Sequence, residues 1–172
     1  EEGPSINGTR KVIDYLNKNN IKIDWCVVGE PSSDKQLADV IRIGRRGSLN
    51  GMLDIQGTQG HVAYPDAADN PIHSASAFLA EITSLEWDQG NASFPATTFQ
   101  ISNLNAGMGA ENVIPGSLKL LFNFRYSTET TEEELQAKVA DILNKYSFNY
   151  NLEWKLSGLP FLTESGKLVD AT

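Results

Sequence analysis

Residues 118–135 read LKLLFNFRYSTETTEEEL, and two different periodicities follow each other in this stretch. In its first half an apolar residue recurs at every second position: Leu118, Leu120, Phe122, Phe124 and Tyr126. That period predicts a strand with one buried face. In its second half, Thr131 stands three residues before Glu134, which is the sequence of a capping box and predicts the start of a helix.

The same two patterns recur on both sides of this stretch. Residues 49–56, 97–104 and 150–156 each predict a further strand, and Asn70 and Pro71 predict the start of a helix. The order over residues 47–158 is therefore β-α-β-β-α-β. This order predicts a ferredoxin-like domain, in which four antiparallel strands carry two helices on one face.

The sequences of the flanking segments predict a different structural class, in which helices alternate with parallel strands. Residues 5–20 predict a helix, residues 23–29 a buried and parallel strand, and residues 40–46 a second strand. We therefore expect residues 1–46 and 159–172 to be parts of a second, α/β domain into which residues 47–158 are inserted.

Composition excludes several classes of protein. The chain has 172 residues and a formal net charge of −8, which argues against binding to nucleic acid. No apolar run approaches the ~20 residues of a membrane span. The only cysteine, Cys26, excludes an internal disulfide, and two histidines are too few for a metal site built mainly from imidazoles. Because the chain begins at Glu1 with no signal peptide, we expect a piece of a longer cytoplasmic protein.

Several charged residues stand where chemistry is plausible. Glu30 follows the apolar run 23–29, at the end of a strand where ligands bind in open α/β sheets, so it is either a metal ligand or base, or a solvated carboxylate. Glu1 and Glu2 are most simply read as a solvated pair. Arg45 and Arg125 suit a small anionic ligand, or else surface ion pairs with the many carboxylates.

His61 lies in the sequence QGHVAYP, residues 59–65. The neighbouring glycine and the loop composition predict an exposed imidazole, able to donate to a developing oxyanion or to act as a general acid or base. The second histidine, His73, falls in the first turn of a predicted helix and is more simply a surface or core side chain.

Six short stretches together resemble a known family. They are residues 28–33 (VGEPSS), 44–48 (GRRGS), 59–65 (QGHVAYP), 70–73 (NPIH), 112–115 (NVIP) and 122–126 (FNFRY). The chain is similar over essentially its whole length to the di-zinc aminoacylase and carboxypeptidase-type amidohydrolases. The resemblance implies that the flanks belong to a zinc-peptidase-like catalytic domain, and that residues 47–158 are its lid and dimerisation domain.

The resemblance also implies roles for single residues. Glu1 matches the general base of the family, and Glu2 and Glu30 match ligands of two zinc or cobalt ions. The remaining metal ligands of the family match no residue here, so we expect this chain to be inactive alone and to hold no metal tightly. His61 matches the lid histidine that reaches the active site of the other subunit. The expected substrate-binding residues are Arg45, Ser48, Asn112 and Arg125.

The two edge strands of the predicted sheet differ in protection. In the usual order of this fold the edges are the second and fourth strands, and residues 97–102 (TTFQIS) lack the charges and prolines that protect an edge. We therefore expect a homodimer through residues 71–105, in which two sheets join into one of eight strands. We expect no nucleic acid and no membrane among its partners.

Overall fold

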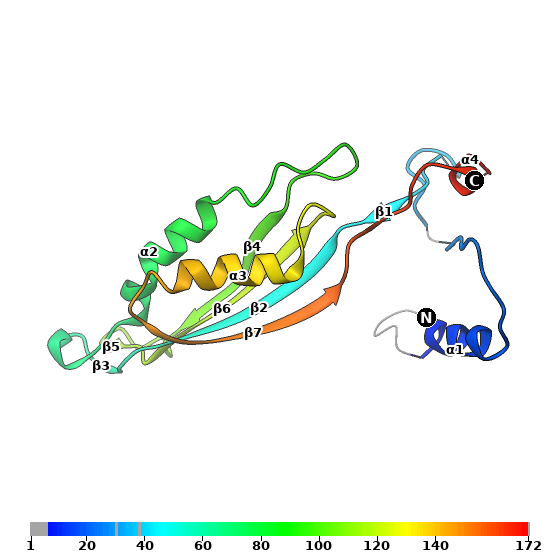
Figure 1. Cartoon of the computed structure of the whole chain (residues 1–172). Coiled ribbons are helices and arrows are strands. Elements are labelled where there is room, and N and C mark those ends of the chain that lie inside the picture. The colour runs from blue at the N-terminus through cyan, green and yellow to red at the C-terminus, as the bar shows by residue number, and fades with distance from the viewer. Residues whose placement is uncertain (1–6, 30, 38, 172) are drawn as a thin grey trace. The chain divides into compact units, whose positions relative to one another are not determined.

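The computed structural model describes residues 7–29, 31–37 and 39–171. The chain forms two compact units, one of residues Arg42–Glu164 and one of Glu1–Ile41 with Ser165–Thr172. The larger unit carries a four-stranded antiparallel sheet, made of β2 (Gly47–Gln56), β4 (Thr98–Ala106), β6 (Ser117–Tyr126) and β7 (Asn149–Gly158). Their spatial order is β4-β6-β2-β7 (Figure 1). The predicted ferredoxin-like fold class is confirmed.

The alternation of side chains in the central strands produces the core. β2 and β6 alternate buried and more exposed residues along their whole length, as a sheet with one covered face requires. Gly51 in β2 lies opposite Phe122 on one side and Trp154 on the other. An added Cβ at Gly51 would come within 2.7 Å of three atoms of the Phe122 ring, so glycine leaves the space that this ring fills.

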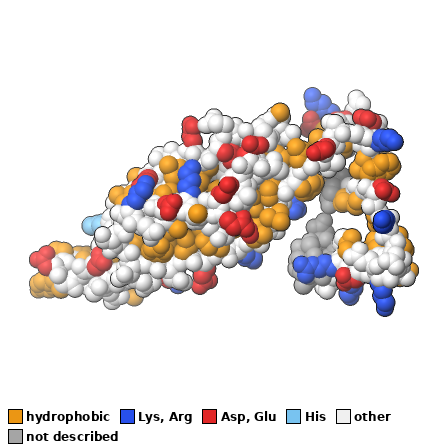
Figure 2. All heavy atoms as spheres, in the orientation of Figure 1, with side chains coloured by type: hydrophobic (Ala, Val, Ile, Leu, Met, Phe, Trp, Pro, Cys, Tyr) orange, Lys and Arg blue, Asp and Glu red, His pale blue; other side chains and the backbone are white. Residues whose placement is uncertain are grey.

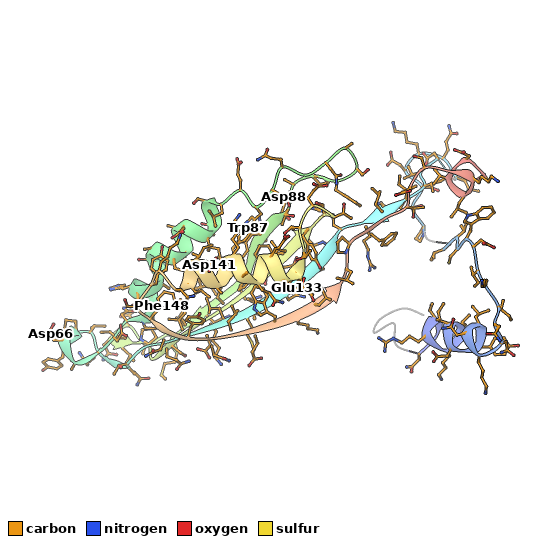
Figure 3. The ribbon with its side chains drawn as sticks, in the orientation of Figure 1. Asp66, Trp87, Asp88, Glu133, Asp141 and Phe148 are labelled. Atoms are coloured by element: carbon orange, nitrogen blue, oxygen red, sulfur yellow. The ribbon has the colours of Figure 1, made fainter. Side chains whose placement is uncertain are left out.

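Two helices cover the buried face of the sheet (Figure 1). Helix α2 (Pro71–Ser84) begins at Asn70, whose side chain accepts a hydrogen bond from the Ile72 amide at 3.0 Å. Helix α3 (Glu132–Leu143) begins with the predicted capping box between Thr131 and Glu134. Phe148 follows α3, and its ring centroid lies 5.9 Å from that of Phe78 in α2 (Figure 3).

Two short ribbons lie outside the main sheet. β1 (Gly44–Arg45) pairs with β8 (Phe161–Leu162), so the chain enters and leaves the larger unit at neighbouring residues. β3 (Gly60–His61) pairs with β5 (Val113–Ile114) beyond the opposite end of β2, and the short 3₁₀ helix η1 (Pro65–Ala67) follows β3.

The edges of the sheet are the strands that the sequence predicts. Within the described residues, β4 pairs only with β6, and β7 pairs only with β2. β7 carries Glu153 and Lys155, whereas β4 carries no charged residue. The edge at β4 therefore lacks the charged side chains that discourage pairing with another strand.

The flanking unit differs from its prediction. It contains α1 (Thr9–Lys18) and α4 (Lys167–Ala171), but residues 23–29 form no strand. Of residues 40–46 only β1 lies in a ladder, and β1 belongs to the larger unit. Trp25, Val27 and Val28 are more than half exposed. The predicted parallel strand is wrong for this structure because the described residues offer no neighbouring strand to pair with it.

Hydrophobic side chains accordingly lie at the surface of the flanking unit (Figure 2). That this unit is part of a catalytic domain stays a prediction. Within the described ranges, no helix combines the length and the apolar character that crossing a membrane requires.

Candidate functional site

The β3–β5 ribbon holds His61 at one end of the larger unit. His61 lies opposite Val113, and the Val62 amide donates to the carbonyl oxygen of Asn112 at 3.1 Å. The structure therefore brings together two of the predicted site residues, His61 and Asn112, and both are exposed. The following turn, where Asp66 is labelled in Figure 3, forms the tip of the unit.

The backbone around His61 determines which ring nitrogen carries the proton. The amide of Ala63 donates to Nδ1 of His61 at 3.1 Å, so Nδ1 acts as an acceptor. In a neutral imidazole the other nitrogen then carries the hydrogen. The Tyr64 amide also donates to the His61 carbonyl oxygen at 2.9 Å, and the Tyr64 ring lies 5.8 Å from the imidazole. His61 thus presents its Nε2–H group as a hydrogen-bond donor.

Three of the four predicted substrate-binding residues, Arg45, Ser48 and Arg125, lie at the other end of the larger unit. Ser48 in β2 lies directly across from Arg125 in β6, and Thr98 in β4 lies on the other side of Arg125. Arg45 in β1 holds its guanidinium carbon 5.9 Å from the centre of the Phe161 ring. Gly158 leaves room for that guanidinium, because an added Cβ would come within 2.9 Å of it.

The arginines of this end are not used in ion pairs with the described part of the chain. The salt bridges in the described part of the chain join Lys119 to Asp54 and Lys145 to Glu81. Neither Arg45 nor Arg125 has a carboxylate partner among residues 7–29, 31–37 and 39–171. Among the described residues, the ion-pair interpretation therefore finds no carboxylate for either guanidinium, and binding of an anion by Arg45 and Arg125 stays a prediction.

One chain keeps the two groups of residues apart. Ser48 and Gln56 are eight residues apart on β2, which at about 3.4 Å per residue is about 27 Å, and His61 lies beyond Gln56. His61 and Asn112 therefore do not meet Ser48 and Arg125 within a single chain. Any site that uses both groups needs a second copy.

The residues predicted to act as the base and as metal ligands lie outside the described ranges. Glu1, Glu2 and Glu30 are not among the described residues. In the described ranges, no three histidine, cysteine, aspartate or glutamate side chains lie close enough together to hold a metal ion. The residues that can be described thus do not make a metal centre by themselves.

Sequence reasoning missed one residue beside the candidate site. The side-chain amide of Asn123 in β6 donates to the hydroxyl oxygen of Ser48 at 3.0 Å. Asn123 occupies a solvent-facing position of an alternating strand, and nothing in the sequence marks it as a partner of Ser48. Only the register of β2 against β6 brings the two side chains together.

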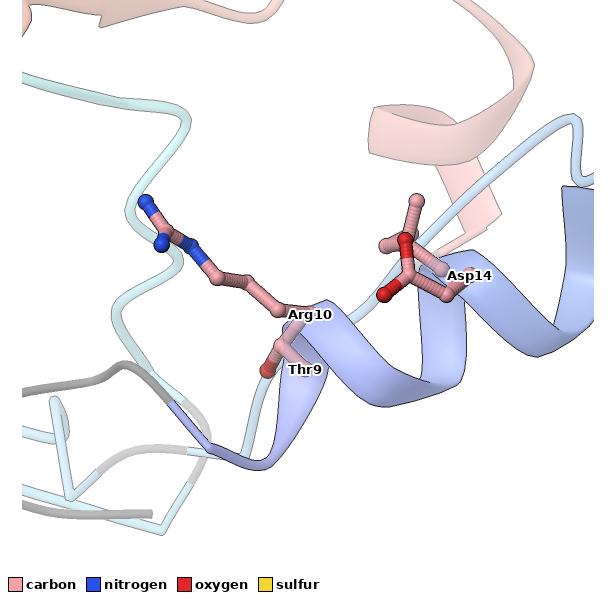
Figure 4. A pocket seen from close by; sticks show the side chains of 4 residues that line it. Thr9, Arg10 and Asp14 are labelled. Carbon is pink, nitrogen blue, oxygen red and sulfur yellow. The ribbon is translucent and has the colours of Figure 1, made fainter.

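A surface hollow in the flanking unit is unrelated to these residues (Figure 4). It is lined by Thr9, Arg10, Ile13 and Asp14, which all lie on α1. A depression formed along one helix encloses little, and none of its residues was a candidate from the sequence.

The sheet has an uncharged edge at β4 that pairs only with β6 within the described residues, and a comparison of the sequence with known families shows where such a domain occurs. Residues 43–151 match the family model described as "Peptidase dimerisation domain". The chain belongs to this family, and the family membership expected from the sequence is confirmed.

Within this family, the chain is similar to enzymes with one particular name. The chain is 61% identical over 171 residues to the succinyl-diaminopimelate desuccinylase of Acinetobacter baumannii strain AYE, covering 99% of this chain and 45% of the relative. It is 57% identical over 172 residues to the enzyme of the same name from Pseudoalteromonas atlantica, covering 100% of this chain and 46% of the relative. The chain thus spans about half the length of these curated relatives.

Solved structures share the fold at low sequence identity. A tripeptidase from Staphylococcus aureus superposes with a TM-score of 0.57 at 16% identity, covering 74% of this chain and 33% of the tripeptidase. The aminopeptidase PepT from Bacillus cereus gives a TM-score of 0.56 at 15% identity, covering 75% of this chain and 34% of that protein.

Proposed function

We propose that this chain is the lid and dimerisation part of a metal-dependent amide hydrolase that converts N-succinyl-LL-2,6-diaminopimelate to succinate and LL-2,6-diaminopimelate. The observation that carries the proposal is the 61% identity to a succinyl-diaminopimelate desuccinylase over 99% of the chain. The protein would then serve lysine and diaminopimelate biosynthesis in a bacterial cytoplasm.

The proposed dimer forms at the open edge of β4. Two copies related by a two-fold axis would pair their β4 strands antiparallel and make one sheet of eight strands. Helix α2 contacts β4 as well as the central strands β2 and β6, and it carries Glu81 as its only acidic or basic residue apart from His73. An uncharged strand beside a nearly uncharged helix supports an interface over residues 71–105.

This two-fold pairing would also complete the candidate site. Antiparallel pairing of β4 with its copy reverses the direction of the second sheet. The end that carries His61 and Asn112 in one protomer then lies at the same end as Ser48 and Arg125 in its partner. Residues that a single chain separates by about 27 Å could act on one substrate.

The described residues suit binding and orientation. The Nε2–H group of His61 can donate to the oxyanion that forms when an amide carbonyl is attacked. Arg45, Arg125 and the Ser48 hydroxyl can bind the carboxylates of the substrate. For His61→Ala in the intact enzyme we expect kcat to fall by about 10²–10³, with a much smaller change in KM. An unchanged kcat in a folded variant would return His61 to an ordinary loop residue.

Two zinc or cobalt ions belong to the proposal only through the family. The expected base Glu1 and the expected ligands Glu2 and Glu30 lie outside the described residues, and no metal-binding group forms among the rest. The proposal therefore gives the described residues no part in holding a metal.

The alternative is a related di-zinc deacylase, such as an acetylornithine deacetylase. Guanidinium and hydroxyl groups fix an anionic substrate without selecting its acyl group, so the described residues fit both activities. Turnover of N-succinyl-diaminopimelate and of N-acetylornithine by the full-length enzyme separates the two. A kcat/KM in favour of N-acetylornithine would overturn the desuccinylase assignment.

Subunit mixing tests whether the site is shared. Full-length His61→Ala and Arg125→Ala variants would each have low kcat/KM. If His61 acts in the partner's site, a purified heterodimer of the two variants has one site with both defects and one intact site. It should regain about half of the kcat/KM of the unmodified dimer. If both residues act within one chain, nothing is regained.

A matched heterodimer provides the control. His61 and Asn112 lie at the same end of the domain, so a heterodimer of His61→Ala with Asn112→Ala should leave one defect in each site. No activity should return in that mixture. Recovery there would contradict the proposed arrangement of the two protomers.

A further inference from the structure

A chain of hydrogen bonds crosses the open face of the sheet and ends at Ser48. The Asn123 side chain donates to the Ser48 hydroxyl oxygen at 3.0 Å and to Oδ1 of Asn50 at 2.9 Å. Asn50 in turn donates from its amide nitrogen to the hydroxyl oxygen of Ser157 at 2.8 Å. The chain thus links three strands, β6, β2 and β7.

Backbone carbonyls fix the direction of this chain. The side-chain nitrogen Nδ2 of Asn123 lies 3.3 Å from the carbonyl oxygen of Leu49. The side-chain nitrogen Nδ2 of Asn50 lies 3.3 Å from the carbonyl oxygen of Lys155. A carbonyl oxygen can only accept, so each side-chain amide must turn its NH₂ group toward it. A flipped Asn123 would place its oxygen against both the Leu49 carbonyl and Oδ1 of Asn50.

The fixed direction has a consequence for Ser48. Because Asn123 donates to its oxygen, the Ser48 hydroxyl hydrogen is not needed for that contact and is free to point elsewhere. Ser48 lies directly across from Arg125, which has no carboxylate partner among the residues that the structure describes. A hydroxyl that donates and a guanidinium that donates, side by side, form a subsite for one carboxylate group.

We propose that Asn123 is a positioning residue, which holds Ser48 as a hydrogen-bond donor toward a carboxylate bound beside Arg125. The inference rests on the proposed function, because it takes the substrate to be an anionic amide. Asn50 supports Asn123 by accepting its second hydrogen. Asn123 acts only through Ser48, and it changes substrate binding rather than the chemical step.

A double-mutant cycle in the full-length enzyme tests this role. Ser48→Ala should raise the KM for N-succinyl-diaminopimelate about tenfold or more, since it removes a hydrogen bond to a charged group. Asn123→Ala should raise KM about threefold to tenfold with kcat within about twofold. In the Ser48→Ala background, Asn123→Ala should change KM by less than about 1.5-fold.

Additional variants separate positioning from a structural effect. Asn123→Asp keeps the shape but makes Ser48 donate to it, so KM should rise at least as much as in Asn123→Ala. Asn151→Ala is the control, because Asn151 lies in β7 and its amide donates to Glu153 of the same strand. Its KM should be unchanged. A full effect of Asn123→Ala in the Ser48→Ala background would overturn the proposal.

Calorimetric binding of succinate to the same proteins keeps the two hypotheses apart. Failure of the unmodified enzyme to turn over N-succinyl-diaminopimelate would refute the proposed substrate alone. The dissociation constants for succinate should still follow the same non-additive pattern across the cycle. Equal dissociation constants for the unmodified protein and the Asn123→Ala protein would refute the positioning role, whichever substrate is turned over.

Discussion

Proline substitutions at the centre of β4 would test the open edge directly. Consecutive residues in a strand direct their N–H groups to opposite sides. Of Gln100→Pro and Ile101→Pro, one therefore removes a donor that faces the open edge, and the other removes a donor that faces β6. The first should weaken dimerisation and leave the fold intact, whereas the second should destabilise the fold.

The two-fold symmetry sets the magnitude of the effect on dimerisation. One substitution removes an outward-facing donor from each protomer, so two interchain hydrogen bonds are lost in each dimer. At about 0.5–1.5 kcal/mol for each bond, the loss is about 1–3 kcal/mol. The dissociation constant should rise by about 5- to 150-fold.

Analytical ultracentrifugation over a range of concentrations measures this constant, and thermal unfolding identifies which variant has lost its fold. Of Glu153→Pro and Trp154→Pro on β7, the variant that keeps its fold is a useful comparison, because it changes the other edge and should leave the dimer unaffected. A monomeric unmodified chain at micromolar concentrations would refute the edge-strand interface. Dimers of unchanged affinity in both β4 variants would also refute it.

Three further predictions concern stability and activity. Gly51→Ala should lower the free energy of unfolding by about 1–3 kcal/mol, because its methyl group would displace the buried Phe122 ring, whereas Gly116→Ala should be nearly neutral in the same denaturant titration. A hydrogen bond from Lys145, and a second from the Tyr146 hydroxyl, lower the pKa of Glu81 in the folded chain. The ionised Glu81 side chain therefore stabilises the fold above the unfolded pKa of about 4.3. This contribution is lost as the pH falls through the lower pKa of the folded chain. The difference in unfolding free energy between the unmodified chain and Glu81→Gln should accordingly be constant above about pH 5.5 and shrink toward pH 3; a constant difference over that range would contradict it. The 172-residue chain alone should show no amide hydrolysis and no submicromolar zinc site; turnover above background, or a stoichiometric zinc isotherm in calorimetry, would contradict this.

The sequence was sufficient for the larger unit because its signals are local. Alternation in residues 118–126 and the caps at Asn70 and Thr131 each act within a few residues, and all three are present in the structure. Residues 23–29 show the opposite case. Their apolar run matches a buried strand, but a strand exists only where another strand pairs with it, and none of the described residues does so.

The candidate site was predictable in its parts but not in its arrangement. The loop composition around His61 predicted an exposed imidazole, but the contact of its ring with the Ala63 amide depends on the turn geometry. Asn123 gave no signal because its role depends on the register of β6 against β2, which places it beside Ser48. Ser48 and Asn123 are separated by 75 residues in the chain, so no local sequence pattern connects them.

The pairing of β1 with β8 makes the larger unit, in effect, a very long loop with closed ends. Gly44 lies opposite Leu162, and Cα atoms paired in this way are about 5 Å apart. The two points at which the domain joins the rest of the polypeptide are therefore as close together as the two ends of a tight hairpin turn. A domain attached in this way can be removed, lengthened or exchanged for another without moving the residues on which it is mounted. Under the proposed function, excision with a short glycine-containing turn between residues 44 and 162 is then the direct way to obtain the rest of the polypeptide without the proposed dimer interface.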